Sequence, residues 1–208
     1  MIGTDTNTII MVAGGESGIN HEMNGVEILH IHENGDILNE DCKSHHLPIP
    51  LAGHSGIYYN NSVVYCGGNH QHSIKKTCYQ MKIGGDDWKE KSEMILEKEN
   101  FDMSELEDIG FVATEIIHND ISTQPVEIYN ERTNGWKRIA DVPVNVYGHC
   151  TVPLSNNKML LIGGMQNNVV SENYYIHLKV LDFNQRTLSI KSHLIFSVLI
   201  KVGRMIWI

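Results

Sequence analysis

One short pattern occurs three times along the chain and constrains its fold more than any other feature. An apolar run ends in a pair of glycines at Gly14-Gly15, Gly67-Gly68 and Gly163-Gly164. The first spacing, between the pairs at 14 and 67, is 53 residues, and the second is 96 residues, which is twice 48. A spacing of about 50 residues is typical of repeat proteins, in which each repeat forms one small structural unit. The sequence therefore predicts a repeated architecture.

Other signals recur in the same phase. The Val-Glu-Ile triplets that begin at Val26 and Val126 are 100 residues apart, and each is followed by Asn-Gly, at 34–35 and 134–135. Asn-Gly between two apolar segments predicts a hairpin with a type I′ turn, because both residues tolerate positive φ. We interpret the chain as four units of short strands, the first of which begins at its second strand. The predicted units are residues 1–47, 48–95, 96–142 and 143–192.

The third unit is the weakest copy of the pattern. Thr114 and Glu115 stand where the glycine pair is expected, 47 residues after the pair at 67–68. The acidic segment 92–107 is compatible with a short helix, and Phe111-Val112-Ala113 fits a second strand. In the first unit, His45-His46 is interpreted as a plain linker.

A small antiparallel sheet cannot bury its faces alone, and four-stranded sheets packed radially around an axis form a β-propeller. The succession of glycine pair, tyrosine and tryptophan, as in Gly67-Gly68, Tyr79 and Trp88, resembles the kelch-repeat family over about residues 8–192. The resemblance implies an all-β fold, a partial kelch-type β-propeller of about four blades with four antiparallel strands each. Four blades are few for such a ring, so we expect a fragment of a larger one. The apolar tail 193–208 is interpreted as the start of a further blade or as non-native sequence.

We expect structural roles for the residues that carry the repeat. Glycine lacks Cβ, so we expect each pair to leave room for aromatic rings such as Tyr79, Trp88, Tyr129 and Trp136. The histidines of the pairs Gly53-His54 and Gly148-His149 stand at the starts of first strands. We expect these histidines to bond backbone groups of a neighbouring blade rather than to catalyse a reaction.

Charge and hydropathy exclude some classes of partner. The net charge is −9, and the 16 Lys and Arg residues form no cluster of the kind that binds nucleic acid. No apolar run reaches the roughly 18 residues of a membrane span, and the N-terminus lacks the pattern of a signal peptide. We expect no nucleic-acid or membrane partner.

The four cysteines suggest neither a zinc site nor a disulfide framework. Cys42, Cys66, Cys78 and Cys150 lie far apart, without a Cys-x-x-Cys pair. We therefore expect reduced, mostly buried thiols in a cytoplasmic protein.

The histidines and acids show no spacing that indicates catalysis. His30 with His32 and His70 with His72 could chelate a metal ion, but no acidic residue or cysteine is fixed beside either pair. Motifs for a serine nucleophile, a phosphate loop, a zinc protease or a dinucleotide site are absent. We predict no metal site, no cofactor and no enzymatic activity.

Recognition is expected on one propeller face. In a four-stranded antiparallel blade, the loop between the second and third strands leaves from the same face as the link to the next blade. These loops are long and varied here, whereas the opposite turns are short, and loops on a rigid scaffold commonly carry recognition. The candidate binding residues are Glu16, Ser17, His21, Asn69, His70, His72, His118, Asn119, Gln166, Asn167 and Asn168.

The predicted function is that of a protein-interaction module that binds a partner protein through these loops. The kelch resemblance implies partners such as ubiquitin-ligase components, for which the chain would be the substrate-recognition part, or actin. The alternative is an enzyme of the galactose-oxidase or sialic-acid-isomerase type, since such enzymes use similar propellers. Convergence of His54 and His149 on a polar central pocket would favour the alternative.

Overall fold

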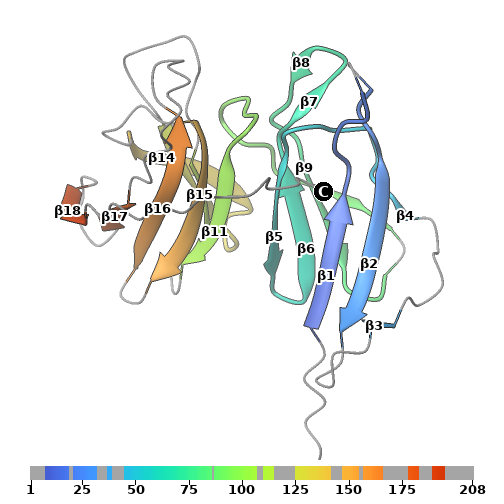
Figure 1. The fold of residues 1–208 in the computed structure, drawn as a ribbon, viewed down its shortest axis with the longest axis horizontal. Coiled ribbons are helices and arrows are strands. Elements are labelled where there is room, and N and C mark those ends of the chain that lie inside the picture. Colours follow the sequence, from blue (N-terminus) through green and yellow to red (C-terminus); the bar gives the residue numbers. More distant parts are fainter. Residues whose placement is uncertain are drawn as a thin grey trace, which may run out of the picture. The chain divides into compact units, whose positions relative to one another are not determined.

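A computed structural model describes residues 8–18, 21–31, 37–38, 45–85, 87–106, 110–114, 125–141, 147–154, 157–165, 178–182 and 189–194. Within these ranges every regular element is a β-strand and all strand pairings are antiparallel, which confirms the prediction of an all-β chain. The described strands form four small sheets and one two-stranded hairpin (Figure 1). The chain divides into two compact units, one made of Met1–Asn100 with Glu131–Trp136 and the other of Phe101–Asn130 with Lys137–Ile208.

Among the described residues, the first strand of the first sheet leads into a glycine pair. Its strands are β1 (Thr8–Ala13), β2 (Gly25–Ile31), β3 (Ile37–Leu38) and β4 (His45–His46). Both β3 and β4 pair with β2, the former near its C-terminal end and the latter near its N-terminal end. Two short strands, β3 and β4, thus occupy the place beside β2 where a single third strand is expected. The interpretation of His45-His46 as a linker was wrong, because these residues complete the sheet.

The second sheet has the order β5-β6-β9-β10. Asn60 and Asn61 join its first two strands with φ values of 48° and 53°, the left-handed pair that a type I′ turn requires. A separate hairpin, β7 with β8, lies between β6 and β9. The bounds are β5 Ser55–Tyr59, β6 Ser62–Cys66, β7 Asn69–His70, β8 Ser73–Ile74, β9 Cys78–Lys82 and β10 Lys89–Lys91.

The third sheet corrects two expectations. Its first strand, β11, lies inside the acidic segment in which a short helix was considered, and it pairs antiparallel with β12 along its whole length. The turn at 134–135 is not a two-residue type I′ turn, because only Asn134 has positive φ and the turn spans residues 131–134. The strands are β11 Asp102–Leu106, β12 Gly110–Thr114, β13 Pro125–Asn130 and β14 Gly135–Asp141.

The fourth sheet keeps the same sequential strand order. Its strands are β15 Tyr147–Leu154, β16 Lys158–Met165, β17 Leu178–Asp182 and β18 Ser189–Leu194. Asn157 precedes β16 with a φ of 53°, which again places an asparagine in the left-handed region of a turn. The other turn predicted from Asn-Gly, at 34–35, lies outside the described residues.

The same set of backbone hydrogen bonds occurs around the glycine pair of the first sheet and around that of the second. In each sheet the backbone N–H of the first glycine donates to a carbonyl at the far end of the following loop. The backbone N–H of the second glycine donates to a carbonyl in the link, by which we mean the segment that leads from one sheet to the next. The bonds of the first sheet are Gly14 N–Gly25 O, Gly15 N–Leu51 O, Met23 N–Gly15 O, Leu47 N–Asn24 O and Leu51 N–Met23 O. Those of the second are Gly67 N–Thr77 O, Gly68 N–Lys98 O, Lys75 N–Gly68 O, Met94 N–Lys76 O and Lys98 N–Lys75 O.

This repetition identifies the link segments as part of the repeat. Leu47 and Met94, which are 47 residues apart, are both buried, and so are Leu51 and Lys98, also 47 apart. A lysine can occupy the position of a leucine because its long aliphatic stem packs as apolar surface. Sequence reasoning had missed these positions.

The core of the first unit joins the first two sheets. Tyr65 and Tyr79 stack with ring centroids 5.3 Å apart, and the indole of Trp88 meets Tyr65 edge-on at 4.9 Å. These rings pack in one cluster with Val26, Leu47 and Leu51, and with further side chains of β1 and β2. Burial of such rings contributes about 2–3 kcal/mol each.

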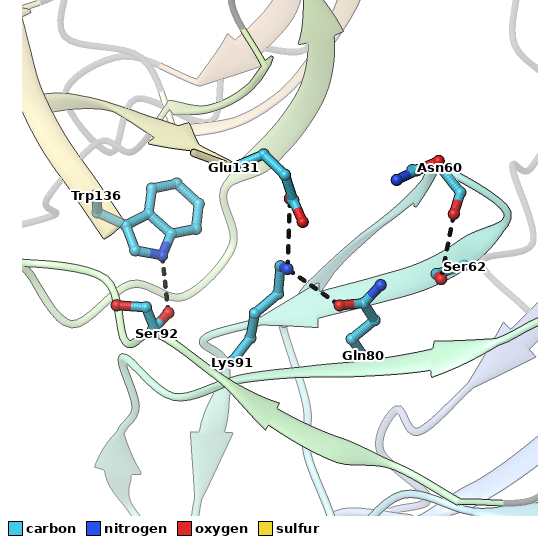
Figure 2. A network of polar contacts seen from close by, with 7 residues as sticks. All are labelled: Asn60, Ser62, Gln80, Lys91, Ser92, Glu131 and Trp136. Atoms are coloured by element: carbon cyan, nitrogen blue, oxygen red, sulfur yellow. Dashed lines mark hydrogen bonds and ion pairs between the residues drawn. The ribbon is translucent and has the colours of Figure 1, made fainter. Parts of the chain in front are cut away.

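The turn that follows β13 belongs to the first unit and carries a polar network (Figure 2). Lys91 is almost buried, and its Nζ donates to Gln80 Oε1 at 3.0 Å and pairs with a Glu131 carboxylate oxygen at 3.5 Å. The indole N–H of Trp136 donates to the carbonyl of Ser92 at 2.9 Å. This bond anchors Trp136 to the segment after β10.

In the second unit, β11 and β15 lie side by side and are joined by side chains. Asp102 Oδ2 accepts from the backbone N–H of Thr151 at 2.5 Å and from its hydroxyl at 2.9 Å, while Oδ1 accepts from Met103 N at 2.9 Å. The hydroxyls of Ser104 and Thr151 are 2.6 Å apart. One carboxylate therefore satisfies a backbone donor at the edge of the neighbouring sheet.

We predict that Asp102→Ala lowers the free energy of unfolding by about 2 kcal/mol, because a half-buried backbone N–H loses its acceptor. Asp102→Asn keeps an acceptor oxygen and should cost less, and Glu105→Ala, at an exposed position of the same strand, should cost little. Urea denaturation followed by circular dichroism measures the three values. Equal losses for all three variants would contradict the role given to the carboxylate.

Candidate binding face

The loop after the first glycine pair is a small hairpin. Glu16 and Glu22 form an isolated antiparallel bridge, and the backbone N–H of Ser17 donates to the carbonyl of His21 at 2.9 Å. Glu16, Ser17 and His21 are all exposed. The loop thus presents three of the candidate residues on a backbone that is held by its own hydrogen bonds.

The loop after the second glycine pair forms the β7–β8 hairpin. Gln71 and His72 turn it with φ values of 51° and 62°, the same left-handed pair as in a type I′ turn. His72 is exposed at the tip. The sequence contains no Asn-Gly or Gly-Gly here, so sequence reasoning had treated the segment as an irregular loop.

The two hairpins meet. The backbone N–H of Gln71, at the tip of the second hairpin, donates to Glu22 Oε1 of the first at 3.1 Å. Two loops that are far apart in the sequence therefore touch in the first unit. We call the surface that they form the hairpin face and define it as residues 16–18 and 21–22 with 69–74.

Asn69 and His70 lie at the foot of the hairpin face rather than on its outer surface. Asn69 forms a β-bridge with Ala52 through hydrogen bonds of 2.7 and 3.1 Å, and its side-chain amide donates to Glu99 Oε2 at 3.1 Å. His70 is half-buried, and its Nδ1 has no hydrogen-bond partner among the described residues. Both side chains are therefore better placed to fix the loop than to contact a partner. The remaining candidates, His118, Asn119, Gln166, Asn167 and Asn168, lie outside the described residues.

The glycine pairs make room for a histidine and for link backbone. A Cβ added to Gly14 would lie 2.8 Å from His54 Cε1 and 2.7 Å from the carbonyl oxygen of Leu51. A Cβ added to Gly68 would lie 2.8 Å from His54 Cβ and 2.9 Å from the carbonyl oxygen of Ala52. The expectation that the pairs accommodate aromatic rings of the Tyr and Trp type was wrong at these sites. His54 fills the space, and its ring meets Tyr65 edge-on at 5.6 Å.

The surroundings of His54 affect its protonation. Burial lowers the pKa of His54 below its ordinary value of 6.5, and an interaction with the Leu51 backbone works in the opposite direction. Neutral imidazole is therefore favoured in the folded protein.

His149 has an equivalent place in the second unit, with a different partner. Its Nε2 lies 2.8 Å from the hydroxyl of Thr114, the residue that replaces a glycine in the third sheet, and that hydroxyl also donates to the carbonyl of Asp102 at 3.2 Å. The histidine was expected to bond backbone of the neighbouring blade. One of its partners is a side chain, because threonine supplies a hydroxyl that glycine lacks.

Two of the cysteines are not reduced thiols. Cys66 and Cys78 face each other at the ends of β6 and β9 and form a buried disulfide. This overturns the expectation of free thiols for this pair, which the sequence could not reveal because 12 residues separate them without a recognisable motif. Cys150 is a free, exposed thiol, and desolvation together with the nearby Asp102 carboxylate raises its pKa.

Chemistry-bearing groups elsewhere in the described residues give no further site. No three His, Cys, Asp or Glu side chains in the described part of the chain are grouped so that they could hold a metal ion. The same residues contain no helix with the length and apolar character needed to cross a membrane. Comparison of the chain with protein-family models and with curated proteins found no match.

We predict that Gly68→Ala destabilises the protein by about 3 kcal/mol or more, because the site combines a φ of 89° with backbone atoms that cannot move aside. Gly25→Ala is the matched control in the same unit, since nothing lies within 4 Å of an added Cβ there. Thermal or urea unfolding distinguishes the two variants. A loss of unfolding free energy for Gly68→Ala that is no larger than the loss for Gly25→Ala would contradict the packing described at Gly68.

We also predict a pH-dependent contribution of His54. Since its pKa is lower in the folded state than in the unfolded state, the unfolded chain binds more protons between the two values. Stability contributed by His54 is full above pH 6.5 and falls as the pH drops through that value, by at most about 1.4 kcal/mol per pH unit. Unfolding free energies at pH 7.5 and 5.5 should differ more for the wild type than for His54→Phe, which keeps an aromatic ring but cannot titrate.

Proposed function

We propose that this chain is a protein-interaction module of the kelch-type propeller kind and that it binds a partner protein through the hairpin face. The observation that supports the proposal is the hydrogen bond from Gln71 N to Glu22 Oε1, which joins two long loops into one surface. Preorganised loops bind with a smaller loss of conformational entropy than mobile ones.

The kelch assignment is supported by the repeated strand order and by the five hydrogen bonds that recur around the first two glycine pairs. Link segments of equal spacing, with buried residues at 47 and 94 and at 51 and 98, give the first two sheets the same connection to the next part of the chain. The adjacent first strands β11 and β15 agree with a radial arrangement of blades in which first strands are neighbours.

The chemistry of the exposed side chains favours a polar, partly cationic partner surface. Glu16 and Glu22 bring two carboxylates to the hairpin face, beside the imidazoles of His21 and His72. Acidic groups at the rim of an interface chiefly accelerate association with a basic partner and exclude acidic ones. Ubiquitin-ligase components and actin stay the partner classes that the kelch resemblance implies.

We propose no enzymatic function. The alternative of an oxidase or isomerase depends on His54 and His149 as functional groups in a polar pocket. His54 packs between two glycines and against Tyr65, and His149 contacts the Thr114 hydroxyl. Both environments suit structural roles.

A cytoplasmic location remains our proposal, although the disulfide removes one of its supports. Disulfides that form in the cytoplasm of most organisms are transient, catalytic or redox-sensing. The location is therefore compatible with the Cys66–Cys78 bond only where that bond responds to redox conditions.

The test compares the proteins that immobilised wild-type chain recovers from a cell extract with those recovered by two triple variants. Glu16→Ala/His21→Ala/His72→Ala changes exposed side chains of the hairpin face, and Lys82→Ala/Lys89→Ala/Glu105→Ala changes as many exposed strand residues elsewhere. We expect a loss of about tenfold or more in the specific partners for the first variant only, as for removal of central contact residues. Unchanged recovery by the first variant, with its fold intact by circular dichroism, would refute the assignment.

A further inference from the structure

The Cys66–Cys78 disulfide closes the base of the loop that carries half of the hairpin face. Cys66 is the last residue of β6 and Cys78 the first of β9, and the two are register partners. All of the chain between them, including β7 and β8, forms the loop. A covalent bond at this point limits how far the two ends of the loop can separate.

The sheet itself does not need this bond. In the first sheet the residue before the glycine pair is Ala13, opposite Val26, and in the fourth sheet it is Ile162, opposite Leu178. The first sheet nevertheless has the same five hydrogen bonds around its glycine pair. Ordinary apolar pairs are therefore sufficient for the architecture, and the disulfide is an addition specific to the loop of the second sheet.

The loop also carries contacts that depend on where its foot and tip lie. At its foot, Asn69 bridges to Ala52 and binds Glu99. At its tip, Gln71 donates to Glu22. If the foot of the loop shifts, the tip moves away from the first hairpin, and the continuous surface is lost.

We propose that the Cys66–Cys78 disulfide is a redox-responsive clasp that holds the hairpin face in its binding geometry. This inference rests on the proposed function, because it names the regulation of the same surface. In the reduced state the sheets persist, but the loop between residues 67 and 77 opens more often and binds its partner less well. In a reducing compartment the clasp is open, and oxidation closes it.

The chemistry is thiol–disulfide exchange with a dithiol reductant. A thiolate of the reductant attacks one sulfur of the Cys66–Cys78 bond, the S–S bond breaks, and a mixed disulfide forms. The second thiol of the reductant resolves it. The reductant leaves as a disulfide, having given up two electrons, and each cysteine sulfur takes up one proton. Because both cysteines are buried, the first step requires the loop to open, so reduction of the folded protein is slow.

The experiment measures hydrogen–deuterium exchange in the full chain in three forms: oxidised wild type, wild type reduced with dithiothreitol, and Cys66→Ala/Cys78→Val. The double variant carries the Ala–Val pair that the first sheet has at the same place, so it suits the fold. Peptides covering 67–77 should exchange about tenfold faster in the second and third forms. Peptides covering β12 should not change, and Cys150→Ser should exchange as the wild type does.

Three results would overturn the proposal. One is equal exchange of 67–77 in all three forms. Another is faster exchange throughout the second sheet, which would make the disulfide a staple of the fold. The third is the finding that Cys66 and Cys78 are alkylated in protein that was prepared with oxidised glutathione and analysed by peptide mapping without reduction, which would mean that the two cysteines are not joined. None of these measurements needs the partner, so their failure is distinct from failure of the loop-substitution experiment.

The functional consequence is tested with the same forms. Recovery of specific partners should fall when the wild type is treated with dithiothreitol, and reductant should have no effect on the double variant. Partner recovery by the wild type that is equal with and without reductant would also overturn the clasp, even where substitutions in the hairpin face abolish binding.

Discussion

The close approach of link backbone to the glycine pairs is the contact on which the rest of the first unit depends. The second glycine of each pair donates its N–H to the carbonyl of a residue in the link, at 2.8 Å for Gly15 with Leu51 and 2.7 Å for Gly68 with Lys98. A side chain at Gly14 or Gly68 would collide with carbonyl oxygens and with His54. The requirement is thus steric and electrostatic together, since only glycine leaves space while it presents a donor.

This contact explains why the proposed binding loops start at the same residues that hold the link segments in place. Each of the two glycine pairs in the first unit follows a strand, holds the link to the next part of the chain and starts a loop. The loop is therefore anchored at its foot by the most constrained backbone in the unit, while its tip faces solvent. Such an arrangement places variable, exposed side chains on a fixed base, which is the usual division of labour between loops and scaffold. The hydrogen bond from Gln71 N to Glu22 Oε1 also connects the second loop to the first.

The features that were predictable from the sequence are those that depend on local chemistry and period. The strands followed from apolar runs and repeat phase. Contacts between distant residues did not follow. The approach of His54 to Gly14 and Gly68 was not predicted, because a small residue in one segment says only that something approaches, and the approaching group is set by tertiary packing. The β11 strand was uncertain because the order of apolar and polar residues in an acidic segment of that length fits both the helix period and the strand period.

The candidate site was predicted to the level of loops but not of side chains, for a related reason. Loop length and polarity predicted the two loops, yet Asn69 braces its loop, and exposure could not be inferred from residue type. The disulfide escaped prediction because cysteine spacing across a loop resembles chance spacing, while strand register decides whether the sulfurs meet. Register is set by burial of one face, so the bond is a consequence of the fold rather than its cause. Because the fold itself brings the two cysteines into register, the sheet does not depend on the bond for its pairing, and this is what the proposed reversible control of the loop requires.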